Sequence, residues 1–160
     1  MKKLAVTLAL AFISSSSAFS KTPPASPLLG SWNVDVSRLP VPADARPKSV
    51  TMTFSKVPAG KWQTKVDIVA PDGSVRAMTS TYSLDGASVP IEGDRMEADT
   101  AAVRMPSPDV LVLALAKGKT PASTRIYKVL TGGTQMVETA VYFDESGKAV
   151  MRTNYFSRAR

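Results

Sequence analysis

The stretch that decides the fold is SVTMTFSKVPAGKWQTKVDIV, Ser49 to Val69. Apolar and polar residues alternate in both halves, and Pro-Ala-Gly separates them. Val50, Met52 and Phe54 share one face of the first half, and Trp62 begins the same pattern in the second. A period of two indicates a strand with one buried and one wet face, and proline and glycine favour a turn. The stretch therefore predicts an antiparallel hairpin.

Similar alternating runs continue toward the C-terminus, separated by turn residues at the spacing of an all-β protein. The turn signals are Pro71-Asp72-Gly73, Asp85-Gly86, Ser107-Pro108-Asp109, Thr131-Gly132-Gly133 and Glu145-Ser146-Gly147. One run, DVLVLALAK at 109–117, is apolar on both faces and fits a helix fragment by pattern alone. Because it is short and flanked by turns, we predict a strand there.

These runs predict an antiparallel up-and-down meander of about eight to ten strands. A long exposed sheet edge promotes aggregation, and closure into a barrel removes it. We therefore predict an all-β barrel, with a β-sandwich as the alternative. The outward faces carry Lys, Asp and Gln in place of a lipid-facing apolar band, which argues against an outer-membrane barrel.

The N-terminus has the pattern of an export signal. Lys2 and Lys3 precede the apolar run of residues 4–13, and small residues follow up to Ser20. We predict a signal peptide at 1–20, cleaved after Ser20, and a periplasmic or secreted protein with no membrane insertion after cleavage. The Pro-rich residues 21–29 are expected to be a tether, and residues 30–160 the barrel domain.

The composition excludes several classes of function. The chain has 20 Lys and Arg against 13 Asp and Glu, but the basic residues are scattered, whereas nucleic-acid binders cluster them. It has no His and no Cys, so disulfides, His- or thiolate-bound metals and catalysis by His or Cys are all excluded. The carboxylates of IEGDRMEAD, 91–99, are predicted to lie in a solvated loop. We expect no enzyme, no cofactor, no metal and no nucleic-acid partner.

Three segments resemble a family of small exported bacterial proteins described as lipocalin-like. They are GSWNVDVSRLPVPADARPKSVTMTF at 30–54, DGASVPIEGDRMEADT at 85–100 and STRIYKV at 123–129. The resemblance implies a lipocalin-like, calycin-type barrel in the cell envelope, and it implies little about activity. It also implies that Gly30 and Trp32 close the base of the barrel. Arg158 is the matching candidate for a cation–π contact with Trp32.

The interior of such a barrel is the candidate ligand site. The side chains assigned to it are Met52, Phe54, Trp62, Met78, Tyr82, Arg125, Tyr127 and Arg152. Small antiparallel barrels hold one small ligand or are filled by side chains, and the apolar members of this set fit either case.

The polar members have two interpretations. If Arg125, Tyr127 and Arg152 face inward, they suit a carboxylate headgroup, because arginine binds carboxylates with two parallel hydrogen bonds. The Arg-x-Tyr spacing is similar to the carboxylate clamp of fatty-acid-binding proteins. In the alternative, both arginines face solvent. An inward Arg125 needs either a ligand or a partner such as Glu138, because an unpaired buried charge is costly.

The sequence thus predicts an exported, non-enzymatic, lipocalin-like protein that binds or carries a small apolar or amphipathic ligand. The alternative is an interaction or structural module of the envelope whose barrel is packed and holds no ligand.

Overall fold

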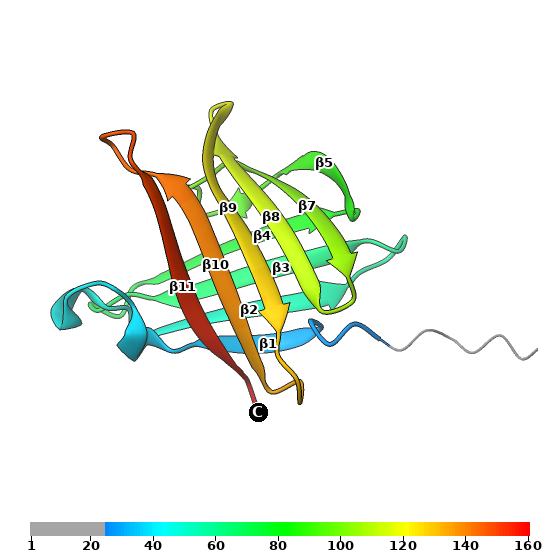
Figure 1. Cartoon of the computed structure of the whole chain (residues 1–160), viewed down its shortest axis with the longest axis horizontal. Coiled ribbons are helices and arrows are strands. Elements are labelled where there is room, and N and C mark those ends of the chain that lie inside the picture. The colour runs from blue at the N-terminus through cyan, green and yellow to red at the C-terminus, as the bar shows by residue number, and fades with distance from the viewer. Residues whose placement is uncertain (1–24) are drawn as a thin grey trace, which may run out of the picture.

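A computed structural model of the chain describes residues 25–160, which form one sheet of eleven antiparallel strands curled into a nearly closed barrel (Figure 1). The strands are β1 (Gly30–Val34), β2 (Ser49–Lys56), β3 (Trp62–Val69), β4 (Val75–Tyr82), β5 (Asp85–Pro90), β6 (Glu92–Gly93), β7 (Thr100–Ser107), β8 (Val110–Lys117), β9 (Thr120–Val129), β10 (Gln135–Phe143) and β11 (Ala149–Arg158). Two short 3₁₀ helices, η1 (Val36–Arg38) and η2 (Ala43–Ala45), lie between β1 and β2. The predicted all-β barrel is confirmed.

The first and last strands of the barrel pair with each other. The strand order is β5-β7-β8-β9-β10-β11-β1-β2-β3-β4-β6, so β1 lies between β11 and β2. The two ends of this order, β5 and β6, are nearly consecutive in the chain, with only Ile91 between them. β5 pairs with β7 and β6 pairs with β4, so the chain itself bridges the gap between the two halves of the meander.

The turn predicted at Asp85-Gly86 lies just before these residues, at Ser83-Leu84 between β4 and β5. Both residues belong to β5, and the pairing with β7 is irregular between Asp85 and Ser88. Gly86 has φ +80°, and a Cβ there would lie 2.7 Å from Nε of Arg104. A β-bulge uses the positive φ of glycine as a turn does, so the sequence signal was the same. The second difference is β6, which lies within the segment predicted to be loop.

The base of the barrel is packed solid. We call "base" the end where β2, β4, β9 and β11 finish, and "rim" the opposite end. Tyr127 lies at the centre of the base, with its ring centroid 5.7 Å from that of Phe54 and 6.1 Å from that of Phe156, both edge to face. Further buried side chains there are Trp32, Trp62, Tyr82, Val103, Leu111, Val129 and Met136. Large, mostly aromatic side chains therefore fill the interior of the base.

Trp32, the fully buried tryptophan of β1, lies against the arginine expected to accompany it. The guanidinium carbon of Arg158 is 4.2 Å from the centroid of the Trp32 ring. Arg158 also donates hydrogen bonds to the carbonyls of Pro27, Leu29 and Gly133. Gly30 has φ +113°, and a Cβ there would be 2.8 Å from Nη1 of Arg158. Glycine is therefore required where β1 begins.

The end of the predicted tether is part of the core. Leu28 is fully buried, and its carbonyl accepts a hydrogen bond of 2.8 Å from Nε1 of Trp32. Two apolar residues follow the prolines, and their burial in the base outweighs the extended character of the Pro-rich segment. The predicted signal peptide, 1–20, and the start of the tether lie outside the described residues. Within residues 25–160, no helix has the length and apolar character needed to cross a membrane.

Candidate ligand cavity

A cavity of about 250 Å³ occupies the rim half of the barrel. Its walls are mainly apolar, with Val50, Met52, Val66, Ile68, Met78 and Leu113 among the lining residues. Leu39, from the segment between η1 and η2, contributes to the lining as well. Pockets for drug-sized ligands measure about 300 to 1,000 Å³, so this cavity suits a smaller molecule.

The structure divides the apolar residues assigned to the ligand site. Met52 and Met78 line the cavity, whereas Phe54, Trp62 and Tyr82 do not. The latter three lie at the base, where they pack against neighbours, and each is at most 4% exposed. The alternation of the sequence places all five of these side chains on the inner face. Whether a side chain lies at the rim or at the base depends on the register of the strands along the barrel axis.

Arg125, Tyr127 and Arg152 all line the cavity. The interpretation in which both arginines face solvent is therefore wrong. Register explains the facing, because Arg125 pairs with Ala140 and Tyr127 pairs with Glu138 across β9 and β10. Ile126, the competing residue, is 37% exposed on the outer face.

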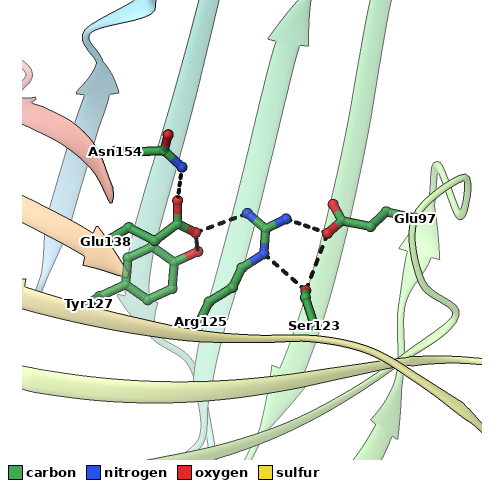
Figure 2. A network of polar contacts seen from close by, with 6 residues as sticks. All are labelled: Glu97, Ser123, Arg125, Tyr127, Glu138 and Asn154. Atoms are coloured by element: carbon green, nitrogen blue, oxygen red, sulfur yellow. Dashed lines mark hydrogen bonds and ion pairs between the residues drawn. The ribbon is translucent and has the colours of Figure 1, made fainter. Parts of the chain in front are cut away.

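Glu138 is the centre of a buried polar network (Figure 2). It is 2% exposed, and its Oε1 accepts hydrogen bonds from Nη1 of Arg125 at 2.9 Å and from the Tyr127 hydroxyl at 2.7 Å. Its Oε2 accepts a hydrogen bond from Nδ2 of Asn154, the residue opposite it on β11. Three donors on one carboxylate are the pattern of an ionised group that replaces water with protein partners.

Arg125 lies between two carboxylates, Glu138 on one side and Glu97 on the other (Figure 2). Its Nε donates to Oγ of Ser123 at 3.4 Å. Burial lowers the pKa of Arg125, but the carboxylates of Glu138 and Glu97 raise it above the ordinary value, so the guanidinium is charged. Burial, and then the charge of Glu138, hold the pKa of Tyr127 well above 10, so its hydroxyl keeps its proton.

The loop of residues 91–99 takes part in this site, which the sequence prediction of a solvated loop missed. Glu97 forms an ion pair with Arg125, and Asp94 is 3.6 Å from Nη1 of Arg76. Both acidic residues line the cavity. Within residues 25–160, no group of three or more acidic side chains is placed to hold a metal ion.

Two buried polar atoms at the cavity have no hydrogen-bond partner among residues 25–160. They are Nε of Arg152 and Oδ1 of Asn154, both on the inner face of β11. Arg152 forms no ion pair with any residue in the described part of the chain. The centroid of the Tyr142 ring lies 5.5 Å from its guanidinium carbon. The cavity therefore has an apolar body and one corner with unmet hydrogen-bonding capacity.

The sequence offered one signal for this network. Glu138 lies between Met136 and Ala140 on an apolar strand face, and the sequence predicts it as a partner for an inward-facing Arg125. Asn154 follows Arg152 by two residues, so alternation puts both on one face of the strand, but the sequence gives Asn154 no role. Glu97 was missed as a partner, because it lies 28 residues from Arg125 in the chain and only closure of the barrel brings them together.

Comparison with known proteins bears on the fold. No known family model and no curated protein sequence matches the chain. Among solved structures, a mutant of the fluorescent protein UnaG is similar, with a TM-score of 0.51 and 15% identity over 82% of this chain and 95% of that protein. The chain therefore has the fold of a lipocalin-like, calycin-type barrel.

Proposed function

We propose that this chain is an exported, non-enzymatic, lipocalin-like protein that binds a small apolar or amphipathic molecule in the rim half of its barrel. The observation that carries the proposal is the cavity of about 250 Å³, with an apolar wall and two buried polar atoms that lack partners. Protein cores are close-packed, and their buried polar groups are nearly always hydrogen-bonded. A cavity that departs from both rules is better explained by a role in binding a molecule than by the needs of packing.

The chemistry of the wall favours binding over catalysis. A nucleophile or general base needs a free reactive atom, often activated by a histidine, and the chain has no His and no Cys. Glu138 holds three donors, and Tyr127 and Arg125 are held by it in turn. The polar atoms of these groups are already hydrogen-bonded to one another. They therefore favour a rigid wall of the cavity over a reactive group.

The outer face of β10 and β11 favours a second candidate, an interaction module of the envelope. Phe143 is 72% exposed and Met151 is 71% exposed. They belong to neighbouring strands, where Val141 pairs with Met151 and Phe143 pairs with Ala149. A cluster of exposed apolar side chains supports contact with another protein. The cavity counts against the version of this candidate in which the barrel is packed shut.

Export and ligand content can be tested together by native mass spectrometry. The full chain is expressed in a bacterium, purified from the periplasm and weighed before and after extraction with organic solvent. We expect the mass of residues 21–160 plus an adduct that extraction removes. The mass of the bare chain in both samples would contradict a tightly held ligand, and an uncleaved chain in the cytoplasm would contradict export.

A cavity-filling variant tests the position of the site. Ala101 on β7 is 1% exposed and lines the cavity, so Ala101→Phe should fill part of it. We expect affinity for octan-1-ol, measured by calorimetry, to fall about tenfold or more, while the circular dichroism spectrum stays unchanged. Ala114→Phe, on the outer face of β8, is the matched control and should bind as wild type does. Equal binding by both variants would place the ligand elsewhere.

A further inference from the structure

The polar corner of the cavity defines what kind of headgroup it can take. Arg152 and Asn154 are two residues apart on β11, so their side chains share the inner face. Asn154 is 7% exposed, and its Oδ1 is buried without a partner, as is Nε of Arg152. A buried polar group without a hydrogen-bond partner is energetically unfavourable, so a ligand that satisfies both groups is favoured.

The orientation of the Asn154 amide follows from its neighbour. Glu138 accepts from Arg125 and Tyr127 on one oxygen, so it acts as an acceptor, and only the NH₂ of Asn154 can face its other oxygen. The amide carbonyl must then point away from Glu138, where Oδ1 has no donor. A ligand that satisfies this oxygen must therefore carry a hydrogen-bond donor.

The group that suits Arg152 is instead a negatively charged hydrogen-bond acceptor. It offers N–H donors and a positive charge, and no carboxylate in residues 25–160 pairs with it. Arg125, by contrast, already pairs with Glu138 and Glu97. Of the two arginines expected to hold a headgroup, only Arg152 has a charge that is still unpaired. Arg125 is instead a positioning residue, which holds the carboxylate that orients Asn154.

We propose that the ligand is a medium-chain monocarboxylate with a hydroxyl group close to its carboxylate. This inference rests on the proposed function and names its ligand class. The carboxylate pairs with Arg152, and the hydroxyl donates to Oδ1 of Asn154. Residues two apart on a strand are separated by about 7 Å, a gap that the long, flexible Arg152 side chain can shorten to meet adjacent groups of one ligand. The alkyl chain then lies against the apolar wall that includes Val50, Met52 and Val66.

Calorimetric titration of the mature chain with three probes tests the headgroup. The probes are 3-hydroxyoctanoate, octanoate and octan-1-ol, which share the apolar chain and differ in the head. We expect the hydroxy acid to bind most tightly and the alcohol most weakly, with about tenfold between the two extremes or more, because hydrogen bonds to charged groups are the stronger ones.

Variants of Arg152 and Asn154 test which side chain binds the carboxylate and which binds the hydroxyl. Arg152→Met should lower the affinity for both acids about tenfold and leave that for octan-1-ol within about twofold. Arg152→Gln, which removes the charge but keeps a polar side chain, should have the same effect. It serves as the second variant if the methionine variant folds poorly. Asn154→Leu should abolish the preference for the hydroxy acid over octanoate. Lys148→Met removes an exposed charge from the hairpin before β11 and is the control with unchanged binding.

The outcomes separate the two proposals. Equal affinities of the wild type for all three probes, or an equal loss for all three in Arg152→Met, would overturn the headgroup assignment while cavity binding stands. Failure of every probe to bind would overturn the proposed function, and this inference with it.

Discussion

At the residue scale, the position that governs the site is a glutamate on an apolar strand face. Glu138 lies between Met136 and Ala140 on the inner face of β10 and is 2% exposed. Removing a carboxylate from water costs several kcal/mol, which only paired charges and hydrogen bonds offset. Arg125 and Tyr127 supply part of that compensation, and Asn154 completes it. Removal of any one member therefore leaves buried polar groups of the others without a partner.

Glu138→Leu should destabilise the protein by about 2 to 4 kcal/mol, because it leaves three buried donors without their acceptor. The loss should fall below the value for a fully isolated ion, since Glu97 still pairs with Arg125. Arg125→Leu combined with Glu138→Leu should recover part of it. Urea unfolding of the two single variants and the double variant measures the coupling. Strictly additive losses would show that the pair does not act together.

Arg158→Met should destabilise the protein by about 2 to 4 kcal/mol. It removes a cation–π contact with Trp32 and leaves three carbonyls at the base without their donor. Chemical denaturation measures the change. Arg160→Met, at an exposed position two residues away, should stay within about 0.5 kcal/mol of wild type. Equal losses in the free energy of unfolding for the two variants would contradict a role of Arg158 in closing the base.

At the element scale, the two-residue strand β6 shows how the barrel is closed between β4 and β5. Gly93 has φ +85°, and a Cβ there would lie 2.3 Å from the carbonyl oxygen of Ala77 on β4. The backbones approach so closely that the N–H of Asp94 donates to that same oxygen at 2.8 Å. Only glycine permits this contact, and it anchors the loop that carries Glu97 to the cavity.

Gly93→Ala should cost more than Gly60→Ala, a matched control in the β2–β3 turn. Gly60 also has a positive φ, +69°, but a Cβ there would meet nothing within 4 Å. We expect about 1 kcal/mol for the control and about 2 to 4 kcal/mol for Gly93→Ala. Hydrogen exchange should show lost protection along β4 and at Asp94 in the Gly93 variant only. Similar exchange in both variants would contradict the close contact.

The elements also show which local patterns can be predicted. Residues 109–117 fit either a helix or a strand, and the flanking turns favoured the strand that the structure contains as β8. Asp85-Gly86 misled because a bulge and a turn use the same glycine conformation. The choice between them depends on whether a partner strand continues alongside, which is β7 here, fifteen or more residues away.

At the scale of the whole molecule, the barrel has a packed base and a hollow rim. The large aromatic side chains gather at the base, and smaller ones such as Ala98 and Ala101 face the cavity. The aromatic packing is therefore concentrated at the base, whereas the wall of the cavity is held by the polar network of Glu138. This division matches a protein that holds its shape at one end and binds at the other.

Alkaline titration should report on the packed base. Burial raises the pKa of Tyr82 to about 12 and outweighs its hydrogen bond with Thr64. Between pH 10 and 12 the unfolded chain loses a proton that the folded protein keeps, so the free energy of unfolding falls as pH rises. The contribution is up to about 1.4 kcal/mol per pH unit. Urea unfolding in this range should show a shallower decline for Tyr82→Phe than for wild type, and an identical decline would contradict the burial of the hydroxyl.

The amino-acid sequence by itself determined the strands, most of the turns and the inner faces, because a period of two and the conformations of glycine and proline are local properties. It therefore predicted the barrel and placed Met52 and Met78 on its inner face, but it left the facing of Arg125, Tyr127 and Arg152 open. Only the tertiary structure decided which inward residues pack and which line a cavity. It also decided that Arg125 is paired, since closure and register bring Glu97 and Glu138 to it, whereas no carboxylate of residues 25–160 pairs with Arg152. Distances along the barrel axis and across its interior depend on the whole sheet, and no local pattern contains them.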